Sequence, residues 1–422
     1  MNQHVLALGV FIVAYLLFVV LPRYRSLVAA VAGCVLVVTG GLSPREALVA
    51  VNWNVMGIFV GTLMVADVFI ESRFPAWFAE FIVNRARNTA WAILFICMMT
   101  GVISAFVENV ATVLVVAPVA LSLSRKLRLD PRSILIAVAI SSNLQGTATL
   151  IGDPPSMLLG GYAKMTFIDF FVYEGRPSIF FAVELGAAAS FFVLFFIFRR
   201  YTQKVALQPV EEVRSWLPPV LLLVLIAALA MSSFFDTGFS FLAGGICMIF
   251  GVAMLLWQTR LRGAHTLASL RRLDWDTTFF LMGIFVIVEG LTTAGWIDVI
   301  SGAFSRAAGE DVLLGYTGLI LFAIFVSAFV DNVPFLAAML PVAQNMAKSL
   351  DVAPSLLLFG LLIGASLGGN ITPIGASANI VACGLSKQAG YPVTFREFAR
   401  ISVPFTIAAV APAAILLWIV WR

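Results

Sequence analysis

The chain has 422 residues, of which 61% are hydrophobic and only 11% are charged. Soluble globular chains carry about a quarter charged residues, so this composition excludes an ordinary soluble domain. The apolar residues fall in runs of about 17–22, the length that crosses a bilayer as a helix. The net charge of +4 comes from basic residues in short loops and predicts membrane topology, not a nucleic-acid partner. We therefore expect an all-α polytopic membrane protein.

In chain order, the first half shows apolar runs that predict five spans. An interfacial helix near residues 74–88 and a re-entrant hairpin near 90–124 lie between the third and fourth spans. The spans lie near residues 5–21, 26–40, 51–70, 131–164 (broken by polar residues) and 178–198.

The second half repeats this order and raises the expected total to about ten crossings plus two hairpins. Its spans lie near residues 216–232, 239–257, 274–293, 354–387 (again broken) and 403–421, with a hairpin near 312–349.

Loop charge predicts the topology. Basic clusters, including Arg23 with Arg25, residues 125–132, and Arg396 with Arg400, fall in loops expected on one side. The positive-inside rule makes that side cytoplasmic, with both termini outside. Each half then crosses five times, an odd number, so the halves insert upside down relative to one another. The linker between them is residues 199–214.

A duplicated motif supports this division. Residues 104–109 read SAFVEN and residues 327–332 read SAFVDN, an offset of 223 positions, and the same offset carries Gly146 onto Gly369. Such a long period is typical of the internal repeats of secondary transporters.

The hairpin tips carry an acid–amide pair in each half, Glu108–Asn109 and Asp331–Asn332. A carboxylate at bilayer depth costs at least about 2.5–3.5 kcal/mol, so it must face a cavity, a cation or a proton. Pairing with a nearby Lys or Arg is the structural alternative. An acid and an amide together offer oxygen ligands for a hard cation.

A second polar interruption breaks the fourth span of each half. Residues 143–153 read NLQGTATLIGD and residues 366–376 read SLGGNITPIGA. Gly, Thr, Asn and Pro unwind a helix, and unwound backbone at this depth must be buried in protein or line water. Its carbonyls can ligate cations. The candidate solute- or ion-binding residues here are Asn143, Gly146, Thr147, Thr149, Asp153, Gly369, Asn370, Thr372 and Asn379, with Na⁺ possible at Asn109, Gly146, Asn332 and Gly369.

Asp153 has an alternative role, because Asp before Pro is typical of a helix N-cap. Ala376 takes its place in the second half, where we expect Ser377 to cap instead. Asp67 and Glu289 form a weaker matched acidic pair, since they lie near span ends and could reach the headgroups or pair with Arg.

The runs NVATVLVVAPVALSLSRKLRLDP and NLQGTATLIGDPPSMLLGG resemble the ArsB/NhaD branch of the ion-transporter superfamily. That superfamily includes arsenite permeases, sodium–proton antiporters, the melanosomal P protein and divalent anion–sodium symporters. Glu108 departs from the Asp more usual at the first tip. The symporters carry Ser-Asn-Thr at these tips, so an acid here favours a cation, a proton or a neutral hydroxide over a dicarboxylate.

The resemblance implies a homodimer in which each protomer has a scaffold and a transport domain that moves as an elevator. The first repeat would be residues 1–204, with scaffold spans in 1–90 and transport elements in 90–204. The second would be residues 205–422, divided into 205–311 and 312–422.

These patterns predict a secondary transporter of the cell membrane, first of all for proton-coupled efflux of arsenite or antimonite. A Na⁺/H⁺ antiporter and a Na⁺-coupled anion symporter are the alternatives, and a passive channel or a membrane enzyme fits less well. No G-x-x-x-x-G-K-[ST] loop occurs, so ATP-driven pumping by this chain alone is disfavoured, and the need for a partner ATPase is open. We expect no cofactor, and H⁺ or Na⁺ as the coupling ion.

Overall fold

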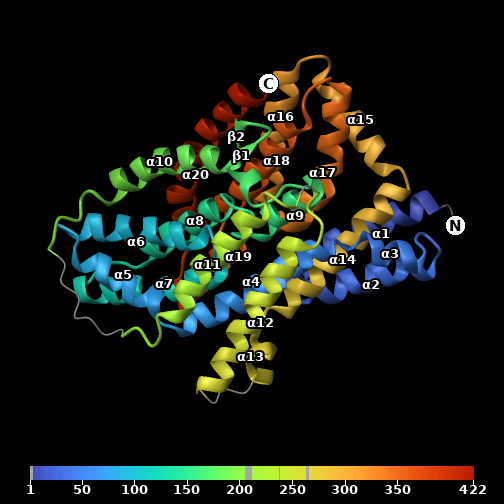
Figure 1. Cartoon of the computed structure of the whole chain (residues 1–422). Helices are drawn as coiled ribbons and strands as arrows, with labels where there is room; N and C mark the ends of the chain where they lie inside the picture. The colour runs from blue at the N-terminus through green and yellow to red at the C-terminus, as the bar shows by residue number, and fades with distance from the viewer. Residues whose placement is uncertain (1–2, 205–211, 237, 263–265) are drawn as a thin grey trace.

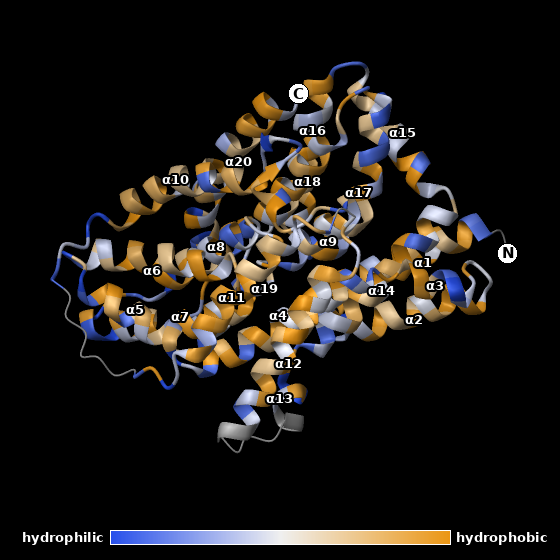
Figure 2. Cartoon of the chain, in the orientation of Figure 1, coloured by the Kyte–Doolittle hydropathy of each residue, from blue (hydrophilic) through white to orange (hydrophobic). Residues whose placement is uncertain are grey.

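The structure, a computed structural model, describes residues 3–204, 212–236, 238–262 and 266–422. It is built of helices with a small two-stranded ribbon (Figure 1). Eight described helices are long and apolar enough to cross a bilayer, and three shorter apolar helices accompany them. Figure 2 shows apolar residues along most of these helices. The all-α polytopic fold is confirmed. The predicted repeat boundary at residue 204 adjoins residues 205–211, and the middle of the predicted linker falls within them. These seven residues lie outside the described residues.

The first half runs from α1 to α10. Its elements are α1 (Gln3–Val20), η1 (Pro22–Tyr24), α2 (Arg25–Val38), α3 (Pro44–Ala50), α4 (Trp53–Glu71), α5 (Phe74–Asn84), α6 (Thr89–Ser104), α7 (Asn109–Leu127), α8 (Arg132–Gly146), α9 (Pro154–Ala163), η2 (Ile168–Phe170), β1 (Val172–Tyr173), β2 (Arg176–Pro177) and α10 (Ile179–Phe198).

The second half repeats the helix order. Its elements are α11 (Leu217–Ser232), α12 (Leu242–Arg262), α13 (Thr266–Arg272), α14 (Trp275–Thr293), α15 (Trp296–Ala308), α16 (Val312–Ser327), α17 (Asn332–Ser349), α18 (Pro354–Gly368), η3 (Gly369–Ile371), α19 (Ser377–Gln388) and α20 (Phe395–Trp421).

The predicted interruptions lie where the helices stop. Both broken spans end their first helix at the predicted breaks, α8 at Gly146 and α18 at Gly368, one residue before the repeat-related Gly369. They resume at Pro154 and Ser377, which are 223 positions apart. The predicted hairpins are the helix pairs α6–α7 and α16–α17. The helices α4 to α10 thus match α14 to α20 one by one.

Apolar runs alone did not predict the short helices α3, α13 and α15 or the strand pair β1–β2. With only seven residues, α3 is too short to register as a span. The start of α20 also differs from the prediction. It begins at Phe395, eight residues before the expected 403, because Thr394 and Glu397 form a capping box ahead of the apolar run.

Two groups of helices meet at the centre of the molecule. In one group α4 packs on α12 and α14 packs on α2, and in the other α10 packs on α20 and α16 on α18. The groups touch where α4 meets α9 and where α14 meets α17. The scaffold and transport roles expected for the early and late elements of each half stay a prediction.

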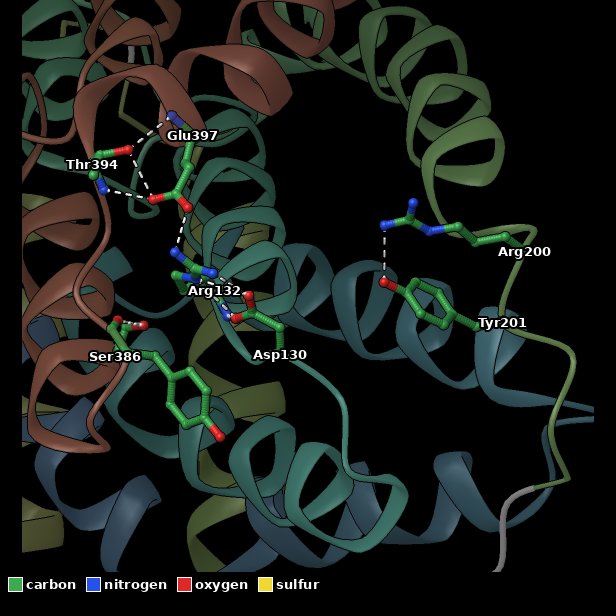
Figure 3. A network of polar contacts seen from close by, with 8 residues as sticks. Asp130, Arg132, Arg200, Tyr201, Ser386, Thr394 and Glu397 are labelled. Carbon is green, nitrogen blue, oxygen red and sulfur yellow. Dashed lines mark hydrogen bonds and ion pairs between the residues drawn. The ribbon is translucent and has the colours of Figure 1, made fainter.

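Arg132 ties the start of α8 to the start of α20 (Figure 3). Its guanidinium contacts Asp130, with Nη2 2.6 Å from Oδ2, and also donates to Glu397. The same Arg132 side chain keeps the pKa of Asp130 below its usual value. The basic clusters at residues 125–132 and 396–400 therefore lie at one end of the molecule, as the loop charges predict.

Candidate functional site

Both hairpin tips open into one cavity of about 360 Å³ between the two halves. Glu108 and Asn109 come from the first tip, and Asp331 and Asn332 from the second. The repeat therefore brings together two acid–amide pairs that are 223 residues apart in the chain.

Each tip carboxylate begins the helix that follows it. Glu108 accepts a hydrogen bond from the backbone N of Ala111 at 2.9 Å, and Asp331 accepts one from Val333 at 3.0 Å. These N-cap bonds point the acids at the helix N-termini, where negative charge is stabilised. Among the described residues Asp331 has an ion-pair partner and Glu108 has none. The alternative of simple charge pairing therefore holds for only one tip.

That partner is Arg25, the first residue of α2. Its Nη1 lies 3.1 Å from Asp331 Oδ2, its Nε lies 2.9 Å from Asp276 Oδ2, and its Nη2 donates to Thr277 Oγ1 at 2.6 Å. The sequence analysis assigned Arg25 to a loop. It is instead the side chain that joins α14 to the second hairpin tip.

Two acids that the sequence analysis did not select also line the cavity, Asp274 and Asp276. Asp274 caps α14 by accepting from Thr277 N at 2.9 Å. An offset of 222 pairs them with Asn52 and Asn54, so amides in one half become acids in the other. This change in charge between repeats is the sequence signal that could have found them.

The cavity is strongly acidic. Arg25 is the one basic side chain that lines it, beside five carboxyl groups, so its formal charge is −4 when all are ionised. Such a field attracts cations and protons and repels polyanions. The carboxyl groups are those of Glu108, Asp153, Asp274, Asp276 and Asp331.

An amide network joins the halves beneath the cavity. Asn143 Nδ2 donates to Asn370 Oδ1 at 2.8 Å and to Asn379 Oδ1 at 2.9 Å. Asn109 Nδ2 reaches Asn143 Oδ1 at 3.4 Å, and Ser104 donates to Asn109 Oδ1 at 2.6 Å. Asn143 lines the cavity wall, so one amide connects the first tip to Asn370 in the second break and to Asn379 on α19.

The remaining polar candidates shape the broken helices and do not line this cavity. Thr149 donates to the tip carbonyl of Ala105, and Thr372 donates to Ala328 in the other half. Asn379 Nδ2 donates to the carbonyls of Gly369 and Thr372 at 2.9 and 3.0 Å. Thr147, Thr149, Asn370, Thr372 and Asn379 are fully or almost fully buried. Their direct role in binding stays a prediction.

Glycines let backbone oxygens converge at each break. A Cβ at Gly146 would collide with the Asn109 amide, and one at Gly152 would meet the carbonyls of Gly146 and Ala105. In the second half Gly375 faces the carbonyls of Gly369 and Ala328. Amide and carbonyl oxygens are ligands for hard cations, and among the described residues no group of three His, Cys, Asp or Glu could hold a metal. The four predicted Na⁺ positions stay predictions.

Asp153 has both roles considered for it. Its Oδ1 accepts from Ser156 N at 2.9 Å and caps α9, and the side chain also lines the cavity. The expectation that Ser377 caps α19 is wrong. Ala376 holds the N-cap position with no side-chain bond, so Ser377 stands one residue too late.

The weaker acidic pair lies outside this cavity. Asp67 is one turn from the end of α4, and its Oδ2 is buried without a hydrogen-bond partner among the described residues. Glu289 lines a different cavity.

Broken helices, hairpin tips and a polar cavity shared by two inverted halves define a membrane transporter. The chain matches the family described as CitMHS, citrate transporter, over residues 15–364 and 251–422, and it belongs to that family. The resemblance to the ArsB/NhaD-type superfamily is thereby confirmed.

Relatives agree with this assignment. The chain is 29% identical to a 46 kDa membrane protein of Mycobacterium leprae over 98% of both chains. It is 27% identical to the mouse P protein, matching 84% of this chain and 52% of that protein.

Two solved transporters share the fold. The YdaH transporter of Alcanivorax borkumensis has a TM-score of 0.62 at 13% identity, over 99% of this chain and 98% of that one. The efflux pump MtrF of Neisseria gonorrhoeae has a TM-score of 0.59 at 15% identity, over 92% and 84%.

Proposed function

We propose that this transporter exchanges protons for a small neutral or cationic inorganic solute, with arsenite or antimonite as the first substrates to test. The observation that carries the proposal is the shared cavity, in which Glu108 and Asp331 meet from opposite halves beside Asn109 and Asn332. Ionised carboxylates accept hydrogen bonds from a trihydroxide, amides both accept and donate them, and the oxygens of both groups ligate cations.

The acidity of the cavity gives the coupling a physical reason. Moving a site with several unneutralised carboxylates through hydrocarbon is costly. A proton or a bound cation removes part of that charge. Glu108 has no ion-pair partner within the described part of the chain, so it would take up a proton on the return step, and Asp331 would exchange Arg25 for the solute. Solute leaving and protons entering then use the same carboxylates in turn.

Sodium–proton antiport is the second candidate. The amide and carbonyl oxygens around Asn109 and Gly146 favour it, because they offer cation ligands without requiring a further charge. Na⁺ and H⁺ would then compete for one site.

Citrate is the third candidate, since the family carries that description. A free tricarboxylate would face five carboxyl groups and one guanidinium, so the electrostatics require that a cation or protons accompany it. Citrate should therefore be tested with and without Mg²⁺.

The test uses purified protein in vesicles with an imposed pH or Na⁺ gradient. Arsenite, antimonite, ²²Na⁺ and citrate with or without Mg²⁺ are offered in turn. The proposal expects arsenite to accumulate against its gradient only when the pH gradient is present. Arsenite flux that ignores pH removes the leading candidate, and ²²Na⁺ flux driven by pH selects the second.

The amides provide matched variants. We expect Asn332→Ala to abolish transport while leaving thermal stability unchanged, because the Asn332 side chain makes no hydrogen bond with the described residues. Asn109→Ala should abolish transport and also lower stability, since Asn109 bonds Ser104 and Asn143. Wild-type rates in both variants would assign the tips a purely structural role.

Assembly and placement complete the proposal. We propose a homodimer in the cytoplasmic membrane, with both termini outside, in which the hairpins and broken helices move as an elevator against the early spans. Cross-linking in intact cells and terminal-tag accessibility test these points.

A further inference from the structure

A second cavity, of about 310 Å³, lies along the same boundary between the two helix groups as the first; we call this boundary the seam. Glu289 and Thr292 from the end of α14, Asn52 before α4, and Tyr162 near the end of α9 contribute to its lining. It is separate from the acidic cavity, with which it shares no lining residue.

Three helices run from one cavity to the other. On α14, Phe280 lines the first cavity and Phe285 the second, a separation of about 7–8 Å along the axis at 1.5 Å per residue. On α17 the corresponding residues are Val333 and Ala337. The third shared helix is α9. The two cavities are therefore separated along these helices by roughly one to one and a half helical turns.

The cavities face opposite ends of the repeat. Asn52 and Asp274 are repeat-related caps that begin α4 and α14. Asp274 lines the acidic cavity, whereas Asn52 lines the second. Because the halves are inverted, these two helix starts lie on opposite sides of the bilayer. The second cavity opens where α4 begins and α14 ends.

Glu289 has no satisfying partner there. It is half-buried in an apolar helix and has no hydrogen bond or ion pair with the described residues. The neighbouring polar groups are already engaged, since Tyr162 donates to Gln344 and Asn52 donates to the carbonyl of Gly161 at 3.3 Å. An ionisable residue inside a membrane span is by default a candidate for a role in function, because placing its charge there is costly.

We propose that this second cavity is a binding station for a cation or a protonated solute on the side of the bilayer opposite the acidic cavity, with Glu289 setting its preference for positive charge. The station receives what the first cavity releases when the seam between them opens. This inference rests on the proposed transport function, but not on the identity of the solute.

The test measures which side reaches each cavity. Thr292→Cys reports on the second cavity and Ser377→Cys on the first, in a background with Cys34 and Cys383 replaced by Ser. A membrane-impermeant cationic methanethiosulfonate is added to one side or the other of oriented vesicles, and a neutral methanethiosulfonate of similar size is used for comparison. We expect the two cysteines to react from opposite sides.

Charge selectivity is read from the same labelling. At Thr292→Cys the cationic reagent should react about fivefold faster than the neutral one, relative to a free thiol, because one nearby carboxylate attracts it. Glu289→Gln should bring that ratio close to one. Asp67→Asn, which changes the repeat-related acid outside the cavity, should leave the ratio unchanged.

Two results overturn the inference. One is labelling of both cysteines from the same side, and the other is a ratio at Thr292→Cys that Glu289→Gln does not alter. Because labelling needs no substrate, these results are independent of the arsenite assay. Wild-type vesicles that carry no arsenite, Na⁺ or citrate would refute the proposed function while leaving the labelling pattern intact.

Discussion

Arg25 and Asp331 lie 3.1 Å apart, Nη1 to Oδ2, although 306 residues separate them in the chain. The same guanidinium holds Asp276 on α14. One side chain therefore ties the second hairpin tip to the neighbouring helix group, and the tip can move past that group only when this contact breaks.

Replacing Arg25 tests the energetic weight of this contact. Arg25→Met should lower the free energy of unfolding by about 2 kcal/mol, because it leaves the Asp276 and Asp331 carboxylates without their cationic partner. Arg25→Met combined with Asp331→Asn should recover part of the loss. Thermal unfolding in detergent measures both, with Arg23→Met, at an exposed position, as the control. Equal melting temperatures for Arg25→Met and Arg23→Met would show that the contact is weak.

Asn143 should matter more than its repeat counterpart. Asn143→Ala removes two buried bonds between the halves and should destabilise the protein by about 2–4 kcal/mol, since Asn370 and Asn379 lose their donor. Ser366 stands 223 positions later, and its Oγ is buried without a partner among the described residues. Ser366→Ala should therefore be neutral or stabilising. Denaturation of both variants decides the point, and comparable losses would contradict the network.

Gly146 should tolerate no side chain. In Gly146→Ala the new Cβ would collide with the Asn109 amide and push it off the first tip, so we expect at least a tenfold loss of solute flux. A Cβ added at Gly384 would meet no atom within 4 Å, so Gly384→Ala should transport like wild type. Flux in vesicles compares the pair. Wild-type flux in Gly146→Ala would place the essential geometry elsewhere.

The fold could be predicted because its signals are local in the sequence. Apolar runs located the spans, and the paired motifs at Glu108 and Asp331 located both hairpin tips. Gly146 and Gly369 marked the breaks, since few other residues allow backbone to approach so closely. Short elements such as α3 carry too few apolar residues to register.

The site could be predicted only in part, because its walls come from distant segments. Arg25, Asp274 and Asp276 look like ordinary charges at span ends, and only the folded chain brings them to the tips. Thr149 and Thr372 were selected as ligands because they interrupt apolar helices. In the structure their hydroxyls donate to tip carbonyls, contacts that composition does not reveal.

The most direct test of the central claim is proton movement coupled to solute in vesicles carrying a trapped pH dye. With wild-type protein, adding arsenite should drive a pH change, and Glu108→Gln combined with Asp331→Asn should abolish it. Asp351→Asn, which changes an exposed acid outside the cavity, should behave as wild type. An undiminished pH change in the double variant would contradict the claim that the two tip carboxylates, joined in one cavity, carry the coupling.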